Sequence, residues 1–442
     1  MKKIFTILAL VLCAFASAQE TADTMYIFRS DNTIESIAVA EIDSVTFVNP
    51  YQGAASVLPR VYITTPGEVG ITSKTDWLEE CSIRIVDENG AENLNMGTSI
   101  RGRGNTTWTY PKKPYAIKLD SKSQVLGMPK HKRWVLLANW MDRTLLRNDV
   151  ALEMGRRVMA WAPRGKFVEL YLNGEHKGNY YLCEHIKVDK NRVDIKELDE
   201  KTDYNDMSLI TGGYILEYDT NNPKTNEKNY FYSKIKNYPV TIKEPDEDVI
   251  TSSEHPAFLY VQEYVNNLEQ LFEEDKRENA RWNEIENLID VKSYVDWWLI
   301  HELARNSEVL NPKSSYMYKQ RNGKLYAGPI WDFDWLTFTM NNKNHTVVTT
   351  ALYYSYLFKY PEFRIAVKER WSEVKDTFAD IENYILSQAD LIRLSNEVNI
   401  EKWPITKSVN GDEEMTFDEA IEAMRLAFRT RLELIESYIS SL

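Results

Sequence analysis

The chain has 442 residues, 27% of them charged, and a formal net charge of -13 at pH 7. This length allows two or three domains with a substantial core. The acidic balance argues against a nucleic-acid partner, because binding to phosphate backbones requires a basic surface.

The N-terminus predicts a secretory signal peptide. Two lysines follow Met1, an apolar run covers residues 4–16, and small residues precede Gln19, which are the three parts of such a signal. We expect residues 1–18 to be removed and the mature chain to be exported to the periplasm, the cell surface or the medium. No later segment offers the roughly 20 apolar residues that a membrane span needs, so no transmembrane segment is expected.

Cysteine usage leaves two alternatives open. Cys13 leaves with the signal peptide, and a bulky Leu12 before it argues against lipid anchoring. Cys81 and Cys183 can then form one disulfide in an oxidising compartment or remain two buried thiols. Their spacing is not that of a zinc site.

A short β-hairpin module is predicted at residues 22–50. Strand-like runs at 25–28 and 44–48 flank a turn signal at 30–33. Proline and glycine then mark a linker at 51–57. No comparable gap follows, so residues 58–442 are predicted to form one large domain.

That domain is predicted to be α+β with two lobes. The first lobe, about 58–200, is rich in strand-like alternation, with one amphipathic helix at 142–159. Its strands are expected at 60–64, 82–86, 115–119, 167–172 and 179–183. The second lobe, about 255–442, is helical, with helices expected at 258–272, 282–303, 363–384 and 417–439.

A predicted hairpin in the helical lobe leads to two aspartates, Asp332 and Asp334, among Trp331, Phe333 and Trp335. Strand alternation would direct the two acids to opposite faces, so both serve one site only if the strand ends or bends there. Carboxylates in an apolar surround need a cation or hydrogen bonds to compensate for burial. Mg²⁺ or Mn²⁺ with nucleotide phosphates would supply that compensation. The alternative is a structural turn.

Residues 99–107, rich in glycine and hydroxyl groups, predict a phosphate-binding loop. Backbone amides around Gly102 and Gly104, with Arg101 or Arg103, would hold the phosphates. Lys118 follows Gly104 by fourteen residues on a predicted strand, a separation similar to that between the glycine loop and the strand lysine of protein kinases. The alternative for the loop is an ordinary turn between strands. A kinase lysine pairs with an acid on the following helix, and Glu153, in the middle of the predicted helix 142–159, is the candidate; an exposed helix carboxylate is the alternative.

Further polar residues follow apolar elements. Glu184 ends a predicted strand, where a kinase places its adenine-binding connection, and its carboxylate is also within the expected reach of a lysine such as Lys118. Asn306 and Glu308 come directly after the apolar helix 282–303. A carboxylate there would accept a hydroxyl proton as catalytic base, and the amide would support a metal or the loop. A helix cap and a solvated loop are the alternative.

In this order, the segments resemble the CotH family, named for spore coat protein H, whose members are similar to atypical secreted protein kinases. The matching segments are 100–107 with 113–118, 134–139 with 145–148, 168–174, 178–184, 212–217, 302–306 and 329–334. The resemblance implies a bilobal, atypical kinase-like fold. It further implies ATP-dependent and magnesium-dependent phosphorylation of hydroxyl groups on a secreted or envelope protein.

The resemblance also assigns residues. It implies Asp332 as metal ligand, Lys118 on phosphate and Asn311 as a second metal ligand. Where the family usually carries Asn-x-Asp, this chain has Asn306-Ser-Glu308, so the base carboxylate sits about one methylene further out.

Two other functions fit parts of the sequence. A non-catalytic surface or adhesion protein with the kinase-like fold would tolerate Glu308 in place of aspartate. Alternatively, Asp332 and Asp334 form the Asp-x-Asp of a metal-dependent glycosyltransferase. The lack of an alternating βαβ pattern in the first half weighs against the glycosyltransferase.

Overall fold

The computed structural model describes residues 24–28, 34–41, 56–221, 228–340, 345–406 and 409–442. The chain divides into two compact units, 1–55 and 56–442. In the first, β1 (Thr24–Phe28) pairs antiparallel with β2 (Ile34–Ala38). The partner strand expected at 44–48 lies outside the described residues, as do the expected signal peptide and most of the linker.

Seven strands of the second unit close into a β-barrel in the order β3-β4-β5-β6-β7-β9-β8. Neighbours are antiparallel, and a parallel pair, β3 with β8, closes the ring. The strands are β3 (Arg60–Thr64), β4 (Leu78–Val86), β5 (Glu92–Gly102), β6 (Tyr115–Val125), β7 (Met128–Leu137), β8 (Gly165–Leu172) and β9 (Glu175–Glu184). The expected strand-rich first half is thus present, but as a closed barrel rather than the first lobe of a kinase.

Side-chain alternation fills the barrel with apolar residues. On β6, for example, Tyr115, Ile117 and Leu119 are buried in the barrel core, while Ala116 and Lys118 between them are partly exposed on its outer face. Cys81 belongs to this core, whereas Cys183 packs in the larger core outside it. Both thiols are free, so the disulfide alternative is not realised among the described residues.

A second sheet of five strands has the order β11-β12-β10-β13-β14. Its strands are β10 (Tyr214–Tyr218), β11 (Tyr230–Tyr232), β12 (Pro239–Glu244), β13 (Ser315–Lys319) and β14 (Leu325–Ala327). The β13–β14 hairpin is the one predicted before the two aspartates. Strands β10, β11 and β12 were not predicted. In β10, all five residues are buried, so the sequence shows no alternation of apolar and polar residues there.

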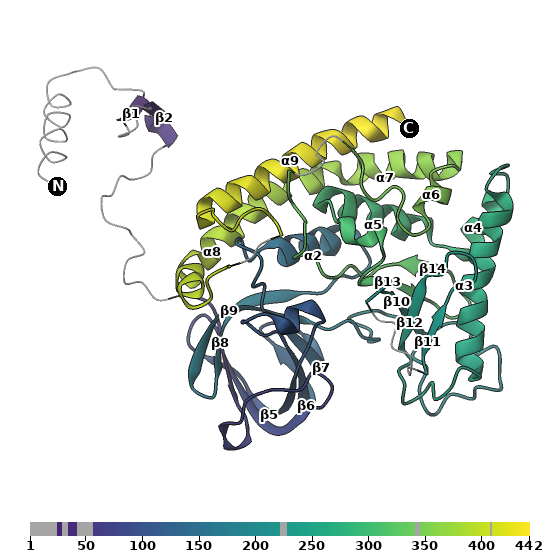
Figure 1. The fold of residues 1–442 in the computed structure, drawn as a ribbon, viewed down its shortest axis with the longest axis horizontal. Helices are drawn as coiled ribbons and strands as arrows, with labels where there is room; N and C mark the ends of the chain where they lie inside the picture. Colours follow the sequence, from purple (N-terminus) through teal and green to yellow (C-terminus); the bar gives the residue numbers. More distant parts are fainter. Residues whose placement is uncertain (1–23, 29–33, 42–55, 222–227, 341–344, 407–408) are drawn as a thin grey trace, which may run out of the picture. The chain divides into compact units, whose positions relative to one another are not determined.

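Helices form the remainder: α2 (Arg147–Val158), α3 (Pro256–Asp275), α4 (Trp282–Leu288), α5 (Val291–Ala304), α6 (Tyr354–Leu357), α7 (Pro361–Ala379), α8 (Ile381–Lys402) and α9 (Phe417–Ser441). The helix expected at 282–303 is two helices, because Asp290 caps α5 by accepting from the Ser293 amide at 2.8 Å. In Figure 1, α7, α8 and α9 lie together along one side, opposite the barrel and the second sheet. None of the described helices is long and apolar enough to cross a membrane.

Candidate active site

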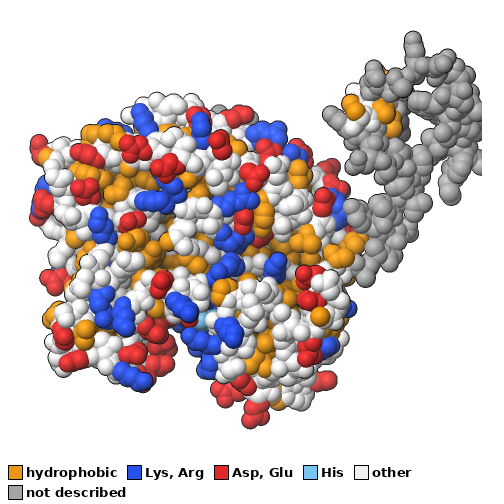
Figure 2. Space-filling view, turned by 180° about the vertical axis from the view of Figure 1, so that it is seen from behind, with side chains coloured by type: hydrophobic (Ala, Val, Ile, Leu, Met, Phe, Trp, Pro, Cys, Tyr) orange, Lys and Arg blue, Asp and Glu red, His pale blue; other side chains and the backbone are white. Residues whose placement is uncertain are grey.

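A cleft of about 690 Å³ lies between the barrel and the second sheet. The barrel contributes residues 101–107, at the end of β5 and just after it, and Arg133 on β7. The sheet side contributes Asp219, Glu308, Asp332 and Asp334. Seen from behind in Figure 2, a notch opens at the lower edge of the molecule, and Lys and Arg side chains gather above it in the middle of the face. Such a volume suits a small-molecule ligand.

The backbone at Asp332 explains how both aspartates reach one cleft. Asp332 has φ = +68°, a left-handed conformation that interrupts the extended chain after β14. The strand alternation that would separate the two acids therefore ends here, and Asp332 and Asp334 both line the cleft. The condition drawn from the sequence, that the strand must end or bend, is met.

Buried neighbours hold the residue between the two acids. The Phe333 amide donates to Asn148 Oδ1 at 2.7 Å, and Asn148 in turn donates to Asn139 Oδ1 at 3.0 Å. The Phe333 ring packs on His301, with ring centroids 4.8 Å apart. Asn148 on α2 also lines the cleft. Helices α2 and α5 thus fix the position of Asp332 and Asp334.

The carboxylates raise one another's pKa. Burial raises the pKa of Asp332, and Arg103 only partly offsets this. The pKa of Asp334 lies well above its ordinary value through burial and the charges of Asp332 and Glu308. Burial and Glu217 raise the pKa of Asp219 to about 6. Four acids that disfavour each other's ionisation keep their protons to higher pH than isolated carboxylates do, and a bound cation would relieve their repulsion.

Glu308, the expected base, lies in the short 3-10 helix η4 (Ser307–Leu310). Asn306 caps this helix by accepting from the Glu308 amide at 3.1 Å, and Lys313 donates to Glu308 Oε1 at 3.1 Å. Burial and the charge of Asp332 raise the pKa of Glu308 to about 7. A carboxylate of this pKa exchanges protons near neutral pH, as a general base must.

The donor set fits a hard divalent cation, since carboxylate oxygens are the preferred ligands of Mg²⁺ and Mn²⁺. Neither Asp332 nor Asp334 has an ion-pair partner among the described residues, and Asp332 accepts one hydrogen bond, from the Ser314 hydroxyl at 3.2 Å. As the side chains stand, no group of three or more acidic, His or Cys residues in the described ranges is arranged to hold an ion. A metal would therefore have to draw the acids together.

Metal binding is expected to depend on pH with a defined sign. Below the raised pKa values of Asp219 and Glu308, about 6 and about 7, a cation must displace protons. Mg²⁺ affinity should therefore increase as pH rises through this range. Calorimetric titrations below, between and above the two values will measure it, and an affinity that stays constant would contradict the assignment.

The opposite wall of the cleft is basic. The Arg101 and Arg133 guanidinium groups lie 4.6 and 4.9 Å from the Trp77 ring centroid, and the Arg103 guanidinium lies 5.3 Å from the Trp331 ring centroid. Burial and the charges of Arg133 and Arg103 lower the pKa of Arg101. Three guanidinium groups this close favour a multiply charged anion such as a polyphosphate.

The end of β5 and the loop after it accommodate only glycine at one position each. A Cβ on Gly102 would come within 2.4 Å of the Trp108 ring, and one on Gly104, at φ = +85°, within 2.0 Å of Thr107 Oγ1. Both residues line the cleft, as does Arg101. The close approach of backbone to the cleft is what a phosphate-binding loop requires.

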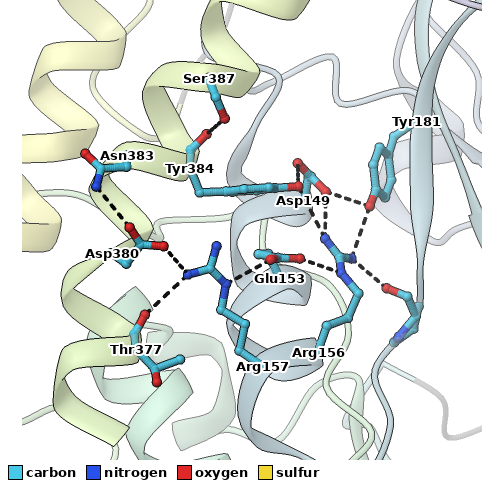
Figure 3. A network of polar contacts seen from close by, with 11 residues as sticks. Asp149, Glu153, Arg156, Arg157, Tyr181, Thr377, Asp380, Asn383, Tyr384 and Ser387 are labelled. Atoms are coloured by element: carbon cyan, nitrogen blue, oxygen red, sulfur yellow. Dashed lines mark hydrogen bonds and ion pairs between the residues drawn. The ribbon is translucent and has the colours of Figure 1, made fainter.

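Lys118 is not a lining residue of the cleft. It lies on the outer face of β6 opposite Arg133 in the register, but two residues farther along the strand than Ala116, which does line the cleft. Its expected helical partner is also elsewhere. Figure 3 shows Glu153 on α2 bound to Arg156 and Arg157, at 2.7 and 2.8 Å, in a network that reaches α7 and α8. The lysine–glutamate pair of a kinase is therefore not formed by these residues.

Two other expected contacts lie outside the cleft as well. Glu184 is fully buried and accepts from Arg164 Nε and Nη2 at 2.9 Å each, so it anchors the end of β9. The next residues, His185 to Lys187, line the cleft instead. Asn311 is exposed at the end of η4 and does not line it. Asn306 caps the helix η4, which carries Glu308, and it therefore contributes to the site by positioning Glu308.

Four further residues that line the cleft were not predicted from the sequence: Asp219, Arg133, Lys313 and Trp77. Asp219 directly follows the buried strand β10, and an acid in that position could have been recognised as a candidate. Arg133 reaches the site through the pairing of β5 with β6 and of β6 with β7, and it lies near the ring of Trp77, which precedes β4. The register of these strands sets this position, and local sequence patterns do not give that register.

Glu302, at the end of α5, has a structural role. Its buried carboxylate accepts from the amides of Val347, Val348 and Thr349 and pairs with buried Arg431. Glu302→Ala should lower the free energy of unfolding by about 3–5 kcal/mol, because it leaves Arg431 buried and unpaired. Glu373→Ala, which removes an exposed partner of Arg370, is the control and should cost less than about 1 kcal/mol in urea unfolding. Equal losses would contradict this role.

A family model described as CotH kinase protein matches residues 100–435. The chain belongs to the CotH kinase protein family. The match begins within β5 and ends within α9, so it includes every acid of the cleft. This CotH protein is therefore kinase-like. No curated protein matches the chain.

Proposed function

We propose that this CotH protein transfers the γ-phosphate of ATP to hydroxyl groups of secreted or envelope proteins, with Mg²⁺ or Mn²⁺. The main support for this proposal is the charge distribution of the cleft. The guanidinium groups of Arg101, Arg103 and Arg133 line the barrel wall, and carboxylates that include those of Asp219, Glu308, Asp332 and Asp334 line the sheet wall. A metal–triphosphate needs both kinds of group, because carboxylates bind its metal and guanidinium groups bind its phosphates.

Each residue then has a role. Asp332 and Asp334 would hold the metal, which neutralises charge on the phosphates when bound. Arg101 and Arg103, with the amides around Gly102 and Gly104, would bind the phosphates. Glu308, near its pKa at neutral pH, would accept the proton of the acceptor hydroxyl. Asn306 and Lys313 would orient it.

Label transfer tests the proposal. The chain from Gln19 onward is incubated with γ-labelled ATP, Mg²⁺ or Mn²⁺ and casein or envelope proteins, beside Glu308→Gln. We expect transfer by the wild type and a loss of about 100-fold or more in Glu308→Gln, because the amide cannot accept a proton. Absence of transfer by the wild type under all these conditions would contradict the proposal.

The same experiment separates the alternatives. Metal-dependent ATP binding without transfer would indicate a non-catalytic surface protein that retains the fold, for which the longer Glu308 is the supporting observation. Metal-dependent binding of a sugar nucleotide in preference to ATP would indicate the glycosyltransferase.

A further inference from the structure

The segment that carries Asp332 and Asp334 has an irregular backbone. In the described residues 331–338, the chain forms neither helix nor strand. Asp332, Leu336 and Phe338 have φ of +68°, +55° and +50°, left-handed conformations that interrupt any regular ladder of hydrogen bonds. The peptide groups of this segment need other partners, because a buried backbone group without one is unfavourable. The positions of both acids therefore depend on those partners.

Helix α2 supplies partners on one side of the segment. Besides the bond from the Phe333 amide to Asn148, Arg147 Nε donates to the Thr337 carbonyl at 3.0 Å. The Thr337 hydroxyl in turn donates to the Phe333 carbonyl. These bonds hold the peptide groups on either side of Asp334.

The peptide of Asp334 itself is held by Asn410, in the loop between α8 and α9. Asn410 Nδ2 donates to the Asp334 carbonyl at 3.0 Å, and Asn410 Oδ1 accepts from the Leu336 amide at 2.8 Å. Asn410 Nδ2 also donates to the Met141 carbonyl at 3.3 Å. Met141 and Asp334 both line the cleft, so one side-chain amide joins two segments of its wall.

The loop that carries Asn410 is anchored to the same region at two more points. Asp412 is 2% exposed and pairs with Arg147 Nη1 at 2.8 Å. The Met415 carbonyl accepts from Arg143 Nε at 2.7 Å. A side chain can position another group only if it is itself held in place. These anchors, together with the 7% exposure of Asn410, meet that condition.

We propose that Asn410 is a positioning residue of the metal site, whose amide sets where the Asp334 carboxylate lies relative to Asp332. This role rests on the proposed function, in which these two acids hold Mg²⁺ or Mn²⁺. Groups that orient metal ligands without touching the metal contribute about 10–100-fold to metal affinity. Asn410→Ala would leave the Asp334 carbonyl and the Leu336 amide without this partner, so both ends of the turn after Phe333 would be released.

Titration with Mn²⁺, with the free ion measured by electron paramagnetic resonance, tests this role without ATP or acceptor. In the chain from Gln19 onward, Asn410→Ala should bind Mn²⁺ about tenfold more weakly than the wild type, with an unchanged number of sites per chain. A merely structural role would instead lower the number of sites, since misfolded chains bind no ion, and would leave the affinity of the folded chains unchanged. Equal affinity in Asn410→Ala and the wild type overturns the proposal.

Asn266 on α3 supplies the matched control. It is also 7% exposed and accepts from a backbone amide, that of Lys234 at 2.9 Å, but Lys234 is not a lining residue of the cleft. Asn266→Ala should lower the melting temperature and retain the wild-type Mn²⁺ affinity. A tenfold loss of affinity in this variant as well would overturn the proposal.

Two further outcomes are separable. If Asn410→Ala fails to fold, Asn410→Ser, which retains one donor, replaces it and should bind Mn²⁺ several-fold more weakly; unchanged affinity overturns the proposal. Absence of Mn²⁺ binding by the wild type would overturn both this role and the metal site of the proposed function. Wild-type Mn²⁺ binding that is weakened in Asn410→Ala, without phosphotransfer, would contradict the proposed function alone and support the positioning role.

Discussion

Asp332→Asn is expected to remove metal binding and, at the same time, to stabilise the metal-free protein. Mg²⁺ affinity should fall at least about 100-fold, because one of the two carboxylates proposed to hold the metal is lost. The stability gain follows from the raised pKa of Asp332 and Asp334. An acid with a raised folded pKa stabilises the fold while it is protonated, and that stability is lost as pH rises through the folded value.

The asparagine stays neutral at every pH. The gain in unfolding free energy should therefore be on the order of 1 kcal/mol at pH 8 and should vanish at acidic pH, where Asp332 is protonated in both states. Thermal melts with and without Mg²⁺ at the two pH values measure both effects. Ser314→Ala, which removes only the hydroxyl that Asp332 accepts, is the control and should retain metal binding. A metal-free Asp332→Asn less stable than the wild type at pH 8 would contradict the account.

Arg103→Gln is expected to weaken ATP binding by about 10–100-fold, because charge-assisted hydrogen bonds to phosphate are worth about 1.5–3 kcal/mol. Arg103 lies over Trp331 and its charge acts on Asp332, so it is placed between the basic and the acidic walls. Fluorescence titration with ATP and Mg²⁺ measures the change.

Lys118→Gln supplies the matched comparison, since it removes one positive charge from the outer barrel face next to Arg133. ATP affinity should change less than about twofold. A large loss in Lys118→Gln with little change in Arg103→Gln would restore the lysine suggested by the kinase-like spacing and would contradict the assignment from the cleft.

Local sequence patterns predicted many of the strands and helices, because the residues within such an element largely determine whether it forms. The strands at 60–64 and 167–172, the helix before Asn306 and the hairpin before Asp332 all follow from alternation, periodicity and turn residues. The Asp332–Phe333–Asp334 segment was found because two acids among aromatic residues need a compensating partner.

Long-range pairing decided the rest. Barrel closure through the parallel β3–β8 pair is not encoded in either strand alone. The place of Arg133 at the cleft likewise depends on the register of β7 with β6 and of β6 with β5. Lys118 lies at a kinase-like spacing from Gly104 in the sequence, but its position along β6 places it outside the lining of the cleft. Glu153 was the candidate partner of Lys118 because it lies in the middle of the helix. In the structure it pairs instead with Arg156 and Arg157, one turn later on the same helix.

A single-turnover experiment tests phosphotransfer in the cleft: excess protein, γ-labelled ATP and Mg²⁺ are mixed with acceptor protein, and the labelled acceptor is quantified over time. We expect transfer by the wild type and no transfer above background by Asp332→Asn. Transfer that Asp332→Asn retains at the wild-type rate would show that the cleft acids do not hold the metal and would contradict the proposed phosphotransfer.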